Sequence, residues 1–169
     1  MLIGGNVKIL IKAAALLAVV VALGACATEQ AATRSPAADY RYIYKDFDLR
    51  YAWRLAPAAE GLKVEGLIKN VRAQRLENME VRVALLDKNR KVLGEAVAFP
   101  LPQPIDSDDY RSFEVLIKGV QQEPGSLLRF VVNYAASSSQ GSYTWTSNFT
   151  VDAATGQRLG VQKSKDLDW

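Results

Sequence analysis

Histidine is absent from this sequence of 169 residues, and cysteine occurs only once. Without histidine, the chain cannot form Ser-His-Asp or Cys-His catalytic groups, a histidine general base, or the usual zinc and copper sites. A single cysteine cannot form a disulfide within the chain, so a folded domain must rely on its hydrophobic core for stability. Glycine-rich phosphate loops are also missing. We therefore predict a protein that is not an enzyme and that needs no cofactor and no metal.

Carboxylates are the remaining candidates for chemistry. Asp106, Asp108 and Asp109 cluster in one segment, and oxygen-rich loops of this kind can hold Ca²⁺. Their spacing lacks the Asp-x-Asp-x-Asp-Gly pattern of a calcium loop, so we interpret the cluster as a solvated turn. Ser164-Lys165 lies in a polar tail that offers no pocket for a Ser-Lys dyad. An enzyme based on paired carboxylates would need two close, partly buried acids in a cleft.

The N-terminus has the pattern of a secretory signal. Lys8 and Lys12 are its only charges, and the apolar run 13–23 follows, ending at the small pair Gly24-Ala25. Eleven helical residues rise about 16 Å, roughly half of the ~30 Å hydrocarbon core, so the run is too short to span a bilayer. We predict a signal-peptide helix near residues 7–24 and cleavage after residue 25.

The tetrapeptide Leu23-Gly24-Ala25-Cys26 resembles the lipobox of bacterial lipoproteins, with glycine where alanine or serine is more usual. The resemblance implies that Cys26 receives a diacylglycerol on sulfur, that cleavage occurs before it, and that the new amine is acylated. Ala27 follows instead of an aspartate, which by the family's sorting rule favours the outer membrane over the inner membrane. The alternative is a plain secretory protein with a stray cysteine after its cleavage site. We expect a lipid-anchored protein of the bacterial cell envelope that faces the periplasm.

Removal of residues 1–25 leaves 144 residues and lowers the formal net charge from +3 to +1, because Lys8 and Lys12 leave with the signal. A nearly neutral chain gives no global reason to expect nucleic acid as a partner. Residues 26–39 are small and polar and lack periodicity, so we predict a lipidated N-terminus and a flexible tether. Such a tether holds a domain about 20 Å from the bilayer surface.

From Tyr40 to Asp152 the sequence alternates between apolar and polar residues, which is typical of half-buried antiparallel strands. We count seven or eight such strands and no amphipathic helix, and we predict an all-β, immunoglobulin-like β-sandwich of about seven strands over residues 40–152. Residues 79–99 are predicted to form one hairpin, and the three prolines of 99–104 indicate an edge or a loop crossing between sheets. Residues 153–169 are predicted to be a loosely ordered polar tail.

Parts of residues 60–118 resemble the FxLYD-type domains of bacterial envelope proteins. Residues 64–70, Val-Glu-Gly-Leu-Ile-Lys-Asn, correspond to their Val-x-Gly-x-Val-x-Asn strand, and Val83, Leu85, Leu86 and Asp87 occupy the positions of Phe, Leu, Tyr and Asp. The resemblance implies an immunoglobulin-like sandwich and supplies no catalytic motif. A similar pattern occurs in bacterial domains of the late-embryogenesis type. Within it, we assign structural roles to Gly66, Asn70 and Asp87.

Aromatic residues are the remaining candidates for a binding site. Tyr40, Tyr42 and Tyr44 alternate, and we consider them a possible partner surface on an edge strand open to augmentation. Trp53, Trp145 and Phe149 are in phase with buried positions, so we predict them to be core.

Three functions remain open at this point. The first is a non-catalytic envelope lipoprotein that binds another protein as an accessory or assembly factor. The second is a module that binds glycan or peptidoglycan through exposed aromatic side chains. The third is a carboxylate-based enzyme. Fold alone cannot choose among them, because sandwiches host many functions.

Overall fold

The computed structural model describes residues 35–138 and 141–159. The predicted signal helix near residues 7–24 and the Leu23-Gly24-Ala25-Cys26 motif lie outside the described residues. In the described part of the chain, eight strands form two four-stranded antiparallel sheets. The strands are β1 (Tyr42–Lys45), β2 (Leu49–Ala58), β3 (Gly61–Asn70), β4 (Leu76–Leu86), β5 (Val92–Ala98), β6 (Tyr110–Lys118), β7 (Leu127–Ser138) and β8 (Gly141–Asp152).

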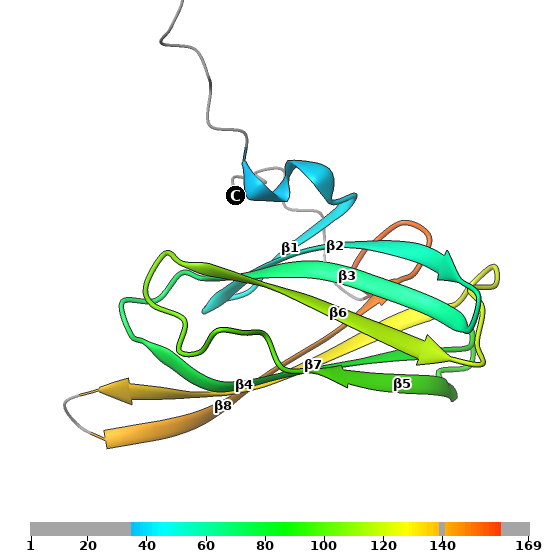
Figure 1. Ribbon diagram of the computed structural model, residues 1–169. Coiled ribbons are helices and arrows are strands. Elements are labelled where there is room, and N and C mark those ends of the chain that lie inside the picture. The colour runs from blue at the N-terminus through cyan, green and yellow to red at the C-terminus, as the bar shows by residue number, and fades with distance from the viewer. Residues whose placement is uncertain (1–34, 139–140, 160–169) are drawn as a thin grey trace, which may run out of the picture. The chain divides into compact units, whose positions relative to one another are not determined.

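The two sheets lie face to face as the layers of a sandwich (Figure 1). Sheet A has the order β1-β2-β3-β6 and sheet B the order β5-β4-β7-β8. The chain crosses between the sheets after β3, β5 and β6, which is the connectivity of immunoglobulin-like sandwiches with one additional strand, β1, at the edge. The predicted fold class is confirmed, and so are the 79–99 hairpin, which is the β4–β5 pair, and the crossing at 99–104.

The core lies between the sheets and follows the predicted alternation. Trp53 is 1% exposed, and its ring centroid lies 5.1 Å from that of Phe130, which stacks on Phe149 at 4.9 Å. The core predictions for Trp53 and Phe149 are therefore confirmed. The other large, fully buried side chains come from strands of both sheets and from the crossing loop: Leu49, Tyr51, Val64, Ile68, Leu76, Met79, Leu85, Ile105, Ile117 and Leu128.

Trp145 is not a core residue, and the prediction that placed it there is wrong. It shares a face of β8 with Phe149, as the alternation indicates, but it is 49% exposed, as is Tyr143. The β7 residues directly opposite them, Tyr134 and Ala136, are buried, so the inner face of the sheet is covered there as far as β7. β8 is the edge strand of sheet B, and the side chains near its beginning, beside the hairpin tip (Figure 1), have a neighbouring strand on one side only. Alternation determines which face a residue occupies, and burial also requires neighbours that cover that face.

The folded domain extends past both predicted boundaries within the described residues. The 3-10 helix η1 spans Pro36–Asp39, and Ala37 is buried against Ala52 and Leu67 on the outer face of sheet A. At the other end, the chain turns back after Asp152: Ala153 is buried, and the amide of Leu159 donates a hydrogen bond to the carbonyl of Thr150 at 3.0 Å. No helix in the described part of the chain has the length and hydropathy of a membrane span.

Candidate binding groove

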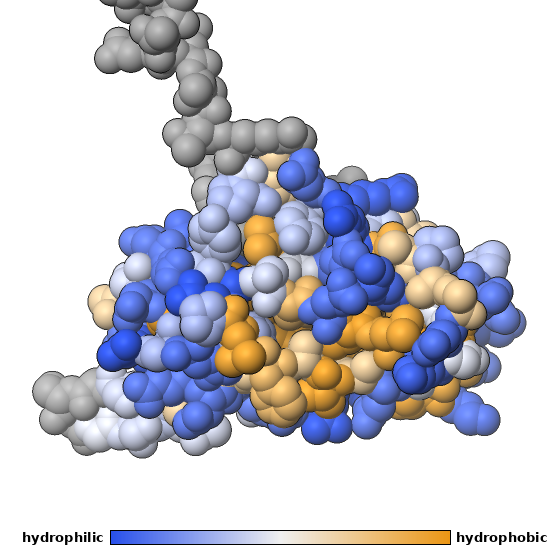
Figure 2. All heavy atoms as spheres, viewed as in Figure 1, coloured by the Kyte–Doolittle hydropathy of each residue, from blue (hydrophilic) through white to orange (hydrophobic). Residues whose placement is uncertain are grey.

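Exposed apolar side chains gather on β5 and the loop that follows it. Val97 begins this cluster, and Phe99 and Leu101 are 60% and 70% exposed. Figure 2 shows hydrophobic residues grouped over β5, β6 and the loop between them. Scattered apolar side chains are normal on a protein surface, but a contiguous group rimmed by polar residues indicates an interaction site.

These side chains form one wall of a groove with a volume of about 580 Å³. The opposite wall comes from β6 and the outer face of sheet A. The two edge strands β5 and β6 flank the groove, and each is paired on one side only. The apolar side is lined by Val97, Ala98, Phe99 and Leu101, and the other side by Tyr40, Arg54, Glu65, Ser112, Phe113 and Glu114.

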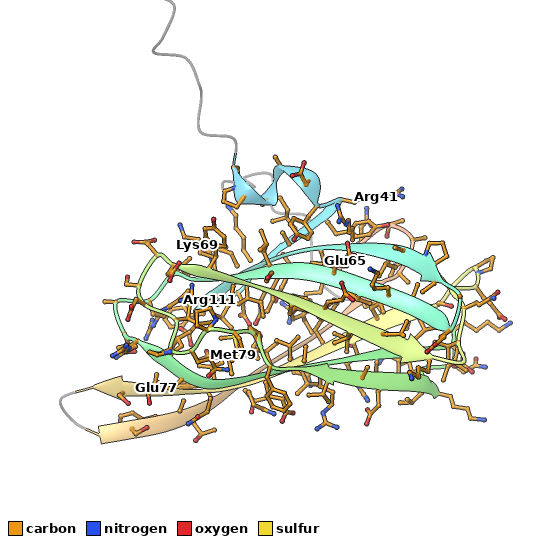
Figure 3. The ribbon with its side chains drawn as sticks, viewed as in Figure 1. Arg41, Glu65, Lys69, Glu77, Met79 and Arg111 are labelled. Atoms are coloured by element: carbon orange, nitrogen blue, oxygen red, sulfur yellow. The ribbon has the colours of Figure 1, made fainter. Side chains whose placement is uncertain are left out.

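The carboxylate at the centre of the polar wall is paired with two cations of the chain. Glu65 on β3 (Figure 3) pairs with Lys63 at 2.8 Å and with Arg54 at 2.6 Å. Hydrogen bonds from Lys63 and Arg54 hold the pKa of Glu65 below its ordinary value. The Arg54 guanidinium also lies over the ring of Tyr40, 5.6 Å from its centroid. Because this central carboxylate is already paired, the wall offers no isolated charge to a small ion, and the groove suits a ligand with apolar groups.

The loop that carries Phe99 and Leu101 is fixed to both sheets. The side chain of Gln103 bridges to the backbone of Met79, accepting from its amide at 2.9 Å and donating to its carbonyl at 3.0 Å. Arg111, at the beginning of β6 (Figure 3), donates from Nε to the carbonyl of Pro102 at 2.6 Å. The apolar wall is therefore held in place, which lowers the entropic cost of binding.

The structure separates the three tyrosines that the sequence grouped as a partner surface. Tyr42 is 8% exposed and its hydroxyl donates to the carbonyl of Ala154 at 2.8 Å, so its side chain belongs to the core. Tyr44 is half-buried, 4.1 Å from Phe149 between ring centroids, and its hydroxyl accepts from Arg158. Tyr40 lines the groove. Tyr42 and Tyr44 belong to β1, which is an edge strand, as predicted, whereas Tyr40 precedes it. Cys26 lies outside the described residues.

The groove was not predicted from the sequence. Val97, Phe99 and Leu101 alternate like inward-facing strand residues, and only the prolines among residues 99–104 indicated that this segment leaves the sheet. The approach of β5 to β6 is a property of the topology, which a local pattern does not contain.

Each aspartate of the acidic cluster at 106–109 forms an ion pair with an arginine or lysine of the same chain. Asp106 pairs with Arg75 at 3.2 Å, Asp108 with Lys69 at 3.3 Å and Asp109 with Arg111 at 2.6 Å. Over residues 35–138 and 141–159, no three acidic, cysteine or histidine side chains are grouped as a metal site would require.

Asp46 and Asp48 are two further acids close together in the sequence, in the β1–β2 turn. Asp46 accepts a hydrogen bond from the hydroxyl of Ser147, and Asp48 accepts one from the hydroxyl of Tyr134 at 2.5 Å. Both carboxylates therefore tie the turn to sheet B.

Comparison with known proteins gives likenesses of fold. No protein-family model and no curated protein matches the chain. Among solved structures, it is similar to the GAE domain of yeast GGA1, with a TM-score of 0.40 and 14% identity over 66% of this chain and 98% of that one. For the GAE domain of GGA2p from Saccharomyces cerevisiae, the TM-score is 0.37 and the sequence identity 9%, over 65% of this chain and 94% of that one. For a β-glucuronidase from Bacteroides uniformis, the TM-score is 0.32 and the sequence identity 11%, over 67% of this chain and 12% of the glucuronidase chain.

Proposed function

We propose that this protein is a lipid-anchored lipoprotein of the bacterial cell envelope with a non-catalytic, protein-binding role. The partner is another envelope protein, and an extended segment of this partner lies in the groove between β5 and β6. The observation that supports this most strongly is a fixed apolar groove flanked by two edge strands. The binding free energy then comes from the burial of apolar side chains, and backbone hydrogen bonds to an edge strand fix the orientation of the bound segment.

The groove favours an extended peptide over a helix or a small molecule. Edge strands present backbone N–H and C=O groups at the spacing that another strand can pair with. On the apolar side, Val97, Phe99 and Leu101 are spaced two residues apart, so they can contact alternate side chains of a strand. The paired charges of the opposite wall add no preference for a charged ligand.

The anchor is the second part of the proposal. Cys26 follows a lipobox-like tripeptide, and several acyl chains on one residue give stable membrane attachment. Mass spectrometry of the protein from membranes should find the N-terminus at Cys26 with diacylglycerol and acyl mass. A Cys26→Ser variant should lose this mass and leave the membrane fraction. Retention of the unmodified chain from residue 1 would contradict the anchor.

Binding is tested by charge substitutions in the lipidated protein. Val97→Lys together with Leu101→Lys should abolish co-purification of the partner, because two charges would be desolvated against it. Thr144→Lys with Thr146→Lys, in the exposed first half of β8, is the matched control and should leave co-purification unchanged. Equal recovery of the same proteins with both double variants would argue against the groove.

A second candidate function is favoured by one observation. Trp145 and Tyr143 are each about half exposed on the inner face of the hairpin tip, two residues apart, and exposed aromatic rings can stack on sugar rings. Glycan binding would quench Trp145 fluorescence in a Trp169→Phe background, in which buried Trp53 is the other tryptophan. Peptidoglycan fragments that leave the emission unchanged would remove this candidate.

A further inference from the structure

A second, smaller groove lies on the outer face of sheet B and is independent of the proposed protein-binding groove. Its volume is about 320 Å³. Arg129 lies in the middle of that face, between Ala84 of β4 and Thr150 of β8 in the strand register. The groove is lined by Leu86, Arg90, Arg129, Asn148, Phe149, Thr150, Arg158 and Leu159, and so contains no acidic residue.

Arg90 and Arg129 differ from most other arginines in the described part of the chain. Arg54, Arg72, Arg75, Arg82 and Arg111 each pair with a carboxylate within 3.3 Å. Among the described residues, no carboxylate lies within ion-pair distance of the two groove arginines. Arg129 is also half-buried, and a cation withdrawn from water in this way is stabilised by an anionic partner.

The two aspartates nearest in sequence to this groove are used elsewhere. Asp87 accepts hydrogen bonds from the amides of Asn89 and Lys91 at 2.8 and 2.9 Å, which closes the β4–β5 turn. Asp152 accepts from the amides of Ala154 and Thr155 at 3.0 and 2.8 Å. Both carboxylates therefore cap turns, and the positive charge of the groove has no internal counterpart among them.

We propose that this groove binds a phosphate group. The guanidinium groups of Arg90 and Arg129 supply forked donors that match phosphate oxygens. The side chains of Asn148 and Thr150 add an amide and a hydroxyl donor on the same wall, and Leu86 and Leu159 bound the site with apolar surface. The guanidinium of Arg158 donates to the Tyr44 hydroxyl at 2.7 Å, so it is already engaged. The phosphate comes either from a phospholipid headgroup or from free phosphate.

Nuclear magnetic resonance on the ¹⁵N-labelled protein in maltoside micelles, which contain no phosphate, tests the proposal with two probes. These are inorganic phosphate and the same micelles mixed with phosphatidylglycerol, with the maltoside micelles alone as the blank. We expect saturable shifts of the Arg90 and Arg129 Nε–H signals and of the Asn148 and Thr150 amides. Shifts with both probes assign a general phosphate site, and shifts with phosphatidylglycerol alone assign a lipid headgroup site.

Arg129→Gln should weaken binding at least tenfold, because it removes a charge-assisted hydrogen bond. Arg82→Gln is the matched control, since Arg82 lies on a neighbouring strand but is paired with Glu80 and Glu95. Arg82→Gln should change the affinity for the phosphate probe by less than twofold. No shift with either probe, or equal losses in both variants, would overturn the proposal.

Discussion

Asn70 shows how one buried polar residue organises the end of the sandwich at which β3 stops. Its amide nitrogen lies 2.8 to 3.2 Å from the carbonyls of Gln74, Ile105 and Asp106, and its amide oxygen accepts from the backbone of Arg72 at 2.9 Å. The structural role predicted from turn chemistry is confirmed. Its reach across 35 residues to Ile105 was not predictable, because a local pattern holds no information about which loop lies opposite.

Replacement of Asn70 by alanine should destabilise the domain by about 2 kcal/mol or more, because buried carbonyls would lose their donor. Urea denaturation measures this loss. Asn89→Ala, the same chemical change in an exposed turn, should stay within about 0.5 kcal/mol. Equal losses for the two variants would contradict the role of Asn70.

Gly66 permits the close approach of Phe113 from the neighbouring strand. A Cβ at this position would lie 2.3 Å from the Phe113 ring and 2.8 Å from the carbonyl of Ala52. Gly66→Ala should therefore destabilise the domain by about 1–3 kcal/mol in urea denaturation. Adding Phe113→Leu should recover part of the loss, since the ring contact is then removed. Additive losses in the double variant would show that the ring is not the obstacle.

Tyr134 makes stability sensitive to alkaline pH. Burial and the hydrogen bond to Asp48 raise the pKa of Tyr134 above its ordinary value of 10.0, and burial raises the pKa of Tyr51 in the same direction. Above pH 10 the unfolded chain releases these protons while the folded chain retains them. Stability is therefore complete below about pH 10 and falls as the pH rises, by up to about 1.4 kcal/mol per pH unit for each group.

Tyr134→Phe should lower stability at pH 8 by about 1–2 kcal/mol, because Asp48 loses a donor. The same variant should lose less stability than the wild type between pH 10 and pH 11. Urea denaturation at these three pH values measures both effects. Parallel pH curves for the variant and the wild type would contradict the raised pKa.

At the scale of elements, the strands were predictable because most are buried on one face only. The period of two located β2, β3, β4, β6, β7 and β8, and polar turn residues located the hairpins. The same period did not show that β8 is an edge strand with an exposed beginning, so it placed Trp145 in the core. It also did not show that β5 and β6 approach each other and leave a groove. Sequence patterns describe one strand at a time, whereas the groove depends on two.

Strand β5 should be the least protected strand of sheet B. It pairs on one side only, and none of its residues is fully buried, whereas β4 beside it pairs on both sides and has seven buried residues. Native-state hydrogen exchange should show β5 amides opening at lower free energy than β4 amides. Equal protection of the two strands would contradict an edge available for pairing.

At the scale of the whole molecule, the described domain runs from its first helical turn at Pro36 to the returning segment at Leu159. Gly156 adopts a positive φ of 70°, and a Cβ there would lie 2.4 Å from the ring of Tyr42. The C-terminal return therefore closes against β1, which is why the polar segment 153–159 is ordered. Composition alone indicated a loose tail, since Tyr42 and Tyr44, which help to order it, lie more than a hundred positions away.

We propose that the lipid-anchored sandwich holds an extended protein segment between β5 and β6. A photo-crosslinking amino acid placed at Phe99 in the living host tests this arrangement, with Thr146 as the control position. We expect one discrete protein adduct at Phe99, joined through one short peptide of alternating apolar residues, and no such adduct at Thr146. Adducts to lipid alone, or the same proteins at both positions, would contradict it.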